Sequence, residues 1–364
     1  MQAALLRRAT STRIMDLYFN RDARFAKWVT TAGLLQEPFV LVDAGAQGGE
    51  HPHWHVLGDH LVVHGFDALE EAITRLRRMN MLRSNRHYHA TALGSRDEER
   101  TFFVNSSNPT ASSMFQPGAG RFAVETSGQT RRVPVRRLDT LLAQHLIPRA
   151  DFLKIDVEGF ELEVLAGARE LIAAGVLGVE TESNFGISPS FPNGHFSTIA
   201  DLLLEHGLLV FDIAFNRVPR ASFQRALVAR GRAATTAADG IGKPSNLNVL
   251  FCRDAVLESD DAGSYRVQPR PLSLDQLIKL IVICELHGLN DIAVDLAERF
   301  AERLGSRLDV ECAIDLLADP SCRDATHDTV LGRRIREMEG SISWRVTAPL
   351  RRLRRALQKF ARGA

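Results

Sequence analysis

The sequence predicts an α/β fold in which helices flank a mostly parallel sheet. Short apolar strand patterns alternate with helical patterns from residue 39 to residue 253. In the segment from Asp151 to Ile172, an apolar strand runs directly into a helix with Val164, Leu165, Ala168 and Leu171 on one face. Helical periodicity also occurs on both sides of this region. We therefore expect an N-terminal helical segment before the sheet and a small C-terminal helical unit after it.

The expected elements can be given in chain order. In the first half of the sheet region, strands are expected at residues 39–42, 61–66, 87–93 and 100–104, with a helix at 69–81. Residues 105–130 are rich in Ser, Asn, Thr, Gly and Pro, which is typical of a lid or binding loop. In the second half, strands are expected at residues 152–155, 176–181, 208–213 and 247–252, with a loop at 183–195 and a helix at 196–206. The last two strands are expected to pair as an antiparallel edge hairpin.

The composition changes after Asp254, and this change sets the expected domain boundaries. The five parts are an N-terminal helical segment at 1–37, a sheet domain at 38–254, a linker at 255–271, a helical unit at 272–337 and a basic amphipathic tail at 338–364. From Ser341 onward the tail has seven basic residues and no acidic one. Such a helix suits an anionic membrane surface or an acidic partner. A solvated terminal helix folded onto its own domain is the alternative.

The overall composition argues against several classes of protein. The formal net charge of +1 gives no field that would attract nucleic acid. No apolar run approaches the ~20 residues of a membrane-spanning helix, and the N-terminus is charged too early for a signal peptide. Cys252, Cys284, Cys312 and Cys322 lack metal or redox spacing, which favours free thiols in a reducing compartment. We expect a cytoplasmic protein, and the sequence leaves its oligomeric state open.

A glycine-rich turn follows the first strand and predicts a nucleoside ligand. Gly45, Gly48 and Gly49 give the spacing G-x-x-G-G, which differs from the dinucleotide fingerprint G-x-G-x-x-G. Asp43 in the turn suits a cation and would repel a pyrophosphate. Asp67 ends the second strand, where an acid can bind the hydroxyls of a ribose. The combination favours S-adenosylmethionine over a nicotinamide dinucleotide.

Two further acids follow the strand at residues 152–155. Asp156 is the first candidate for a general base or an acceptor-orienting group, and Glu158 is the second. Each is equally expected to cap the next helix or bind the donor. His195 is an imidazole alternative as base, and Lys154 is expected to reach a carboxylate.

Other polar residues receive weaker predictions. Glu182, after the next strand, is expected either to contact acceptor hydroxyls or to lie in solvent, and Ser112 and Ser113 are candidates for ligand contact. His51, His53 and His55 have no placed carboxylate or cysteine partner. Surface or packing roles are therefore expected for these histidines, and no metal site is predicted.

Between residues 39 and 253 the chain resembles the FkbM-type methyltransferases. The resemblance is carried by residues 43–49, Phe66-Asp67, Ala92-Leu93-Gly94, Ser112-Ser113, 138–141 and especially Lys154-Ile155-Asp156-Val157-Glu158-Gly159 with the helix after it. It implies a class I (Rossmann-like) methyltransferase fold and an S-adenosylmethionine-dependent enzyme that O-methylates hydroxyls, commonly on sugars or natural products. Donor-binding positions carried over onto this chain are Asp43, Gly45, Ala46, Gln47, Gly49, Phe66, Asp67 and Leu93. Gln47 and Asp67 replace the family's usual Asn and Glu, and both replacements keep the hydrogen-bonding type.

The tail carries a second, weaker resemblance. Residues 341–351 are similar to a segment near the ends of bacterial glycan-assembly proteins, including glycosyltransferases. This similarity implies a surface polysaccharide or lipid-linked glycan as acceptor. Two rival hypotheses remain. One is an NAD-dependent oxidoreductase, which the glycine spacing and Asp43 oppose, and the other is a non-catalytic scaffold in glycan assembly that binds partners through residues 272–364.

Overall fold

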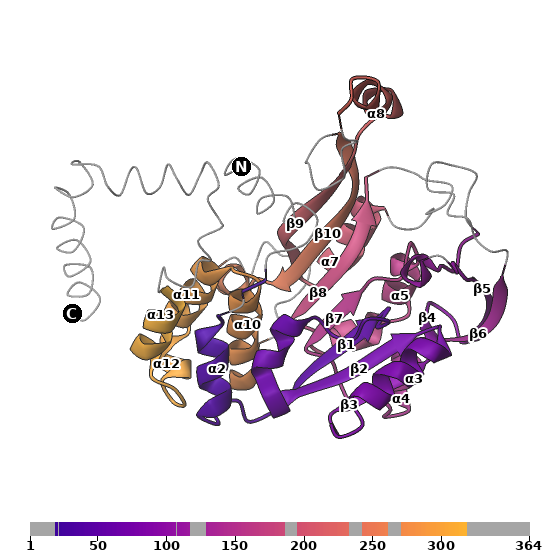
Figure 1. Ribbon diagram of the computed structural model, residues 1–364. Coiled ribbons are helices and arrows are strands. Elements are labelled where there is room, and N and C mark those ends of the chain that lie inside the picture. The colour runs from indigo at the N-terminus through magenta and orange to yellow at the C-terminus, as the bar shows by residue number, and fades with distance from the viewer. Residues whose placement is uncertain are drawn as a thin grey trace. The chain divides into compact units, whose positions relative to one another are not determined.

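The computed structural model describes residues 19–20, 22–106, 108–116, 129–185, 195–232, 242–260 and 271–318 (Figure 1). The basic tail at 338–364, most of the segment before residue 22 and the centres of both predicted loops therefore lie outside the described residues. The described residues form one compact unit.

A seven-stranded sheet forms the centre of this unit. Its strands are β1 (Phe39–Ala44), β2 (Leu61–Asp67), β3 (Arg86–Ala90), β7 (Phe152–Ile155), β8 (Gly178–Asn184), β9 (Leu208–Val218) and β10 (Lys243–Arg253). The order is β3-β2-β1-β7-β8-β10-β9, and β10 alone runs antiparallel to its two neighbours. The expected mostly parallel sheet and the β9–β10 hairpin at its edge are confirmed.

Helices cover both faces of the sheet, as the alternating pattern predicts. One face carries α4 (Leu138–Ala143), α5 (Glu161–Ala166), α6 (Arg169–Ala173) and α7 (Phe196–Leu204), whose apolar residues pack on Val42, Leu153 and Val179. The other face carries α2 (Arg24–Thr31), the 3-10 segment η1 (Pro52–His60) and the C-terminal helices α10 (Leu274–Leu286) and α11 (Asn290–Arg299). Helix α3 (Glu70–Met79) packs through Ile73 and Leu76 against Tyr88 of β3.

Two predicted elements are divided in the structure. The strand expected at 87–93 splits into β3 and β4 (Ala92–Leu93), and β4 joins β5 (Glu98–Phe103) and β6 (Thr130–Arg136) in a small second sheet. The helix expected after Gly159 splits into α5 and α6 at Gly167, where an added Cβ would lie 2.0 Å from the Gly94 carbonyl oxygen. Asp139 Oδ1 then accepts from the N–H groups of Glu170 and Leu171, both at 3.0 Å, and thereby begins α6.

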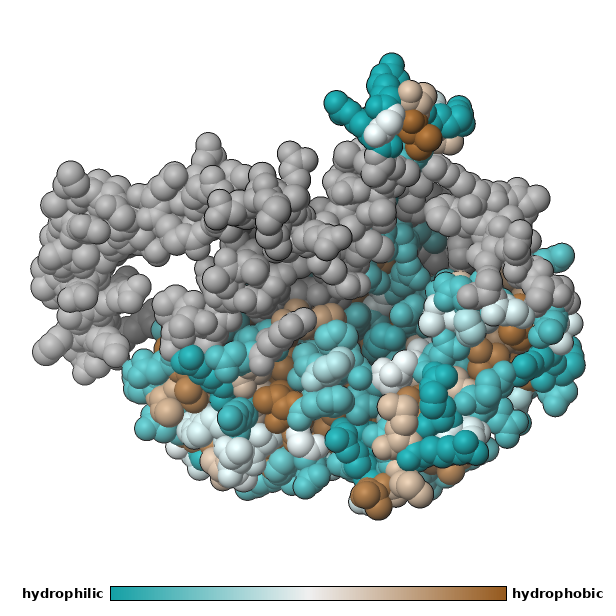
Figure 2. Space-filling model, viewed as in Figure 1, coloured by the Kyte–Doolittle hydropathy of each residue, from teal (hydrophilic) through white to brown (hydrophobic). Residues whose placement is uncertain are grey.

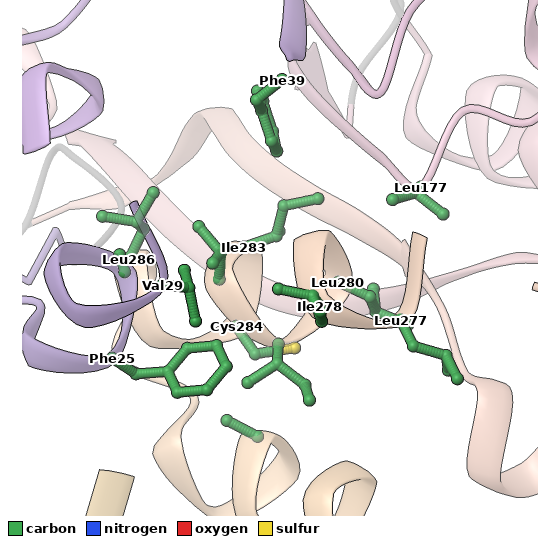
Figure 3. Close-up of a cluster of buried hydrophobic side chains, with 14 of the residues drawn as sticks. Phe25, Val29, Phe39, Leu177, Leu277, Ile278, Leu280, Ile283, Cys284 and Leu286 are labelled. Carbon is green, nitrogen blue, oxygen red and sulfur yellow. The ribbon is translucent and has the colours of Figure 1, made fainter. Parts of the chain in front are cut away.

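The C-terminal helices belong to the same compact unit as the sheet. Eleven of the 13 residues of α10 are buried, and Figure 3 shows its side chains meeting Phe25 and Val29 of α2 and Phe39 of β1. Glu285 in α10 accepts from the backbone N–H groups of Phe25 and Ala26, both at 2.8 Å. The carboxylate of Glu285 thus ties α10 to the first turn of α2.

The remaining elements complete the description. They are η2 (Pro109–Ala111), α8 (Ala221–Val228), α9 (Ala255–Asp260), α12 (Ala301–Leu304) and α13 (Val310–Ala318). Helix α9 occupies the first part of the segment expected as a linker, so the described chain enters a helix directly after β10. Among the described residues, none of the helices has the length and apolar character to cross a bilayer.

Candidate functional site

A cavity of about 380 Å³ lies at the carboxyl ends of β1, β2 and β7. Ligands of open α/β sheets bind at this edge, because the loops after neighbouring parallel strands meet there. Eight predicted site residues line the cavity: Gly45, Gln47, Gly49, Phe66, Asp67, Leu93, Asp156 and Glu158. The structure therefore brings together residues that are more than 100 positions apart in the sequence.

The glycine turn packs tightly against the turn after β7. Gly45 has φ +89°, and a Cβ there would lie 1.8 Å from the Asp156 carbonyl oxygen, so only glycine fits. The N–H groups of Gly45 and Ala46 donate to the Phe66 carbonyl at 2.9 and 3.0 Å. Those two donors are thus used to hold β1 to β2, while Gln47, whose carbonyl accepts from Arg75 at 2.8 Å, and Gly48 line the cavity. The 3-10 segment η1, rather than the regular helix typical of such folds, follows this turn.

Asp43 is buried beside the cavity and pairs with a lysine. Lys154 Nζ lies 3.4 Å from Asp43 Oδ1 and 3.4 Å from Asp156 Oδ2, which confirms the expected contact with a carboxylate. Burial raises the pKa of Asp43, and Lys154 opposes this effect. Burial lowers the pKa of Lys154, but the carboxylates outweigh it and hold the pKa above its usual value. Asp43 therefore acts through Lys154, which lines the cavity while Asp43 and Ala46 do not.

Asp67 stands where the sequence predicts it, at the end of β2. Its Oδ1 accepts from the N–H of Leu69 at 2.8 Å, which fixes the side chain at the cavity wall. Burial raises the pKa of this carboxyl to about 6, against the opposing effect of the Leu69 hydrogen bond. The carboxylate is thus rigidly placed and predominantly ionised near neutral pH.

The turn from Asp156 to Glu161 holds Glu158 in a strained conformation. Glu158 has φ +54°, which is uncommon for a residue other than glycine, and such strain clusters at functional sites. Glu161 Oε1 accepts from Val157 N at 3.2 Å and Gly159 N at 3.0 Å, and Ser113 Oγ donates to the Glu158 carbonyl at 2.7 Å. Hydrogen bonds from both sides therefore fix the backbone that places Glu158 at the cavity.

Several carboxyl groups lie close to this turn and raise one another's pKa. Burial, together with the charges of Glu182 and Asp156, raises the pKa of Glu158 to about 8. Burial and Asp156 likewise raise the pKa of Glu182 to about 7, while an amide hydrogen bond from Asn246 opposes the shift. A carboxyl with a raised pKa in a cavity is a candidate catalytic group, and of these two acids Glu158 lines the cavity.

Some predicted residues lie elsewhere, and some lining residues were not predicted. His195 does not line the cavity; its backbone bridges to Asn184 and its Nδ1 lies 3.1 Å from Ser197 Oγ. His51 Nδ1 lies 2.5 Å from His53 Nδ1, and no metal-binding group of three or more ligands occurs in the described part of the chain. The lining residues that sequence reasoning missed include Phe102, Pro109, Thr110, Met114 and Phe160.

Comparison with known proteins identifies the domain around this cavity. The family profile described as Methyltransferase FkbM domain matches residues 43–208, which include every lining residue of the cavity. The chain carries a methyltransferase FkbM domain. Over these residues the match confirms the family resemblance and the expected class I methyltransferase domain, whose donor is S-adenosylmethionine.

Solved structures show more distant similarity. A methyltransferase FkbM from Methylobacillus flagellatus KT is 16% identical, with a TM-score of 0.34, and the match covers 62% of this chain and 47% of that chain. Fibrillarin from Aeropyrum pernix, solved with bound S-adenosyl-L-methionine, is 11% identical, with a TM-score of 0.31 and coverage of 62% and 76%. N-methyltransferase NodS from Bradyrhizobium japonicum WM9 is 11% identical, with a TM-score of 0.29 and coverage of 64% and 98%. Among curated proteins, no significant match to this chain is found.

The residues of the FkbM domain cavity fit the donor. Gly45 and Gly49 line the cavity with backbone alone, and Asp67 presents a carboxylate suited to ribose hydroxyls. Asp67 and Asp156 both line the cavity, and their carboxylates suit a cationic sulfonium. When bound, S-adenosylmethionine supplies an electrophilic methyl group.

We expect Asp67→Ala to weaken the binding of S-adenosylmethionine and S-adenosylhomocysteine equally. Loss of a hydrogen-bonded carboxylate costs about 1.5–3 kcal/mol, or roughly 10- to 100-fold in dissociation constant. The loss is equal for both ligands because the ribose is common to them. Calorimetric titration of both ligands checks the prediction, with Asp59→Ala, at an exposed aspartate beyond the cavity, as the control. Unchanged affinity in Asp67→Ala would contradict the assigned role.

Proposed function

We propose that this FkbM-domain methyltransferase O-methylates a hydroxyl of a sugar or glycan, in a surface polysaccharide or a lipid-linked glycan. The observation that supports this most is Glu158 at the cavity wall, with its pKa raised to about 8. A hydroxyl is too weak an acid to ionise before it reacts, so its methylation needs a base matched to neutral pH. An ordinary carboxylate, with a pKa of about 4, would be a poor base for that purpose.

In the proposed mechanism, Glu158 takes the acceptor proton as the new C–O bond forms and the bond from methyl to sulfur breaks. The products are a methyl ether, S-adenosylhomocysteine and a protonated Glu158 that later releases its proton to solvent. Asp156 is held by Lys154 at 3.4 Å and lines the same cavity, so it orients the acceptor. Much of the rate enhancement comes from this positioning, which is worth as much as ~7–11 kcal/mol in well-aligned reactions.

The pH dependence of the reaction follows from the ionisation of its general base. Glu158 accepts a proton only when it is ionised, and its pKa is raised to about 8 in the folded protein. We therefore expect kcat/KM to rise with pH from 6 and to level off above about 8, because kcat/KM reports groups in the free enzyme. The initial rate measured at low substrate concentration checks this. A profile that stays flat between pH 6 and 9 would exclude Glu158 as the base.

The acceptor is tested by the methyl ethers that depend on the gene. Surface glycans and lipid-linked glycans from a deletion strain are hydrolysed, and their sugars are compared by mass spectrometry with those of the parent strain. Loss of an O-methyl sugar, restored by the purified protein with labelled donor, supports the proposal. An unchanged set of O-methyl sugars overturns it.

Ligand binding separates the rival functions. Thermal stabilisation by S-adenosylmethionine and S-adenosylhomocysteine is expected, whereas stabilisation by NAD alone would favour an oxidoreductase. Stabilisation by none of the three would favour a scaffold.

We also propose that the enzyme works in the cytoplasm, at the inner face of the membrane. The buried free thiols of Cys252 and Cys284 support a reducing compartment.

A further inference from the structure

The β9–β10 hairpin extends beyond the rest of the sheet and carries α8 at its tip. We call residues 216–232 and 242–245 the β9–β10 arm. The pairing between β10 and β8 begins at Asn246, whereas β10 and β9 continue to pair at Pro244 and Lys243. Figure 1 shows α8 standing away from the body of the molecule, at the end of this hairpin.

The arm projects from the edge of the sheet that holds the active-site cavity. Strand β10 runs antiparallel to both β8 and β9, so β8 and β9 run in the same direction. The carboxyl end of β9, where the arm begins, therefore lies at the same edge as the carboxyl ends of β7 and β8. Glu182 near the end of β8 pairs in register with Asn248 of β10.

The arm is strongly basic. Between Asp212 and Asp239 the sequence has no acidic residue and five arginines, at 217, 220, 225, 230 and 232. The guanidinium groups of Arg217 and Arg230 donate to carbonyl oxygens of Gly242 and Ala226, within the arm itself. In the described part of the chain, no carboxylate lies within ion-pair distance of these five arginines. The arm's positive charge is therefore presented to solvent.

The same arm exposes apolar side chains. Helix α8 has no buried residue; Phe223 is 40% exposed and Val228 is 61% exposed. Leu227 lies four residues after Phe223, on the same side of the helix. Figure 2 shows hydrophobic and hydrophilic residues side by side on this projecting tip.

We propose that the β9–β10 arm docks on an anionic lipid bilayer. A bilayer with acidic headgroups matches both features at once, because arginines bind the headgroups and Phe223 and Val228 enter the acyl boundary. A soluble polyanion would use the arginines but not the apolar side chains.

Docking through the arm would turn the cavity edge of the sheet towards the membrane. The docking does not depend on the acceptor. Membrane docking would favour a lipid-linked glycan over a free polysaccharide as the acceptor, and this consequence rests on the proposed function. The arm would then deliver the active site to a hydroxyl that is tethered near the headgroups.

Vesicle binding by the full chain tests the docking. The probes are vesicles of phosphatidylcholine with and without phosphatidylglycerol, measured by cosedimentation. The charge variant Arg220→Gln/Arg225→Gln/Arg232→Gln is expected to lose on the order of ten-fold or more in partition onto anionic vesicles. Its matched control, Arg78→Gln/Arg83→Gln/Arg96→Gln, removes the same charge from exposed positions away from the arm and should bind like the unchanged protein. Equal binding by the two triple variants overturns the proposal.

A fluorescent reporter tests insertion directly and independently of the tail. An environment-sensitive dye on Val228→Cys, in a Cys312→Ser/Cys322→Ser background, should shift to the blue on anionic vesicles. The same dye on Leu82→Cys, a 97% exposed position outside the arm, should not shift. The absence of a shift at position 228 would overturn the proposal. Inhibition of vesicle binding by dextran sulfate that is equal in the unchanged protein and in Phe223→Ser/Val228→Ser would also overturn it, because the arm would then bind a polyanion. Donor binding should stay unchanged in every variant, so failure here is distinct from failure of the proposed methyl transfer.

Discussion

Replacing Glu158 with glutamine is expected to lower kcat for methyl transfer by roughly 10²- to 10⁴-fold. Glutamine keeps the size and hydrogen-bonding reach of the side chain but cannot accept the acceptor's proton. The turn should stay intact, because its hydrogen bonds come from Glu161 and from Ser113 to the Glu158 backbone. Single-turnover rates with saturating donor and acceptor measure the effect without a contribution from product release.

Two comparisons decide which acid takes the proton. Asp156→Asn keeps a polar group at the cavity but removes one of the two carboxylate partners of Lys154, so a smaller fall in kcat and a larger change in acceptor KM are expected. Glu70→Gln, at an exposed position at the start of α3, is the control and should leave the rate unchanged. If Glu158→Gln retains activity within ten-fold while Asp156→Asn loses more, Asp156 is the base. Affinity for S-adenosylhomocysteine should remain within a few-fold in both variants.

The sequence predicts the donor half of this site well, for a geometric reason. Asp67, the glycine turn and Asp156 each directly follow a recognisable strand, and the carboxyl ends of neighbouring parallel strands meet. Strand patterns alone therefore bring these residues together. His195 does not line the cavity, and the sequence could not predict its position because no pattern specifies where the loop at 183–195 carries its side chains.

The protonation state of Glu158 could not be predicted from the sequence. Its pKa depends on burial and on Glu182, which comes from the next strand and is itself bonded by Asn246 of β10. The residue type alone predicts the ordinary pKa of a glutamate. Only the folded structure shows that other carboxyl groups lie close to Glu158 and raise its pKa. Phe102 and Met114 were missed for a related reason: they are buried together around the small second sheet, whose pairing joins strands far apart in the chain.

The C-terminal helices show where pattern reading reaches its limit. The periodicity around Leu277, Ile278 and Ile281 predicts a helix, and α10 is present. Apolar residues nevertheless occur on every side of this helix. Such a pattern indicates a helix that is buried all round, rather than one with an exposed face on a separate unit. Lys279 within that run has no exposed surface and contacts Asp151, which directly precedes β7. A buried ion pair between α10 and the sheet makes the helix an integral part of the methyltransferase core.

Replacing Lys279 with methionine is therefore expected to lower the free energy of unfolding by about 3–5 kcal/mol, because it leaves a buried carboxylate without its cation. Lys279 Nζ lies 2.9 Å from Asp151 Oδ2 and 2.8 Å from the Pro38 carbonyl, and burial lowers its pKa against the opposing effect of Asp151. Methionine fills a similar volume, so lost packing contributes little. Denaturant unfolding of the full chain measures the change, with Lys27→Met on the exposed side of α2 as the control.

The double variant Lys279→Met/Asp151→Asn distinguishes the ion pair from packing. Asparagine removes the unpaired charge and keeps an oxygen for the Val40 N–H, which Asp151 Oδ2 accepts at 2.7 Å. Its unfolding free energy should therefore exceed that of Lys279→Met alone, since removal of both charges is far less costly than removal of one. A double variant as unstable as the sum of the two single variants would show that the two residues act independently.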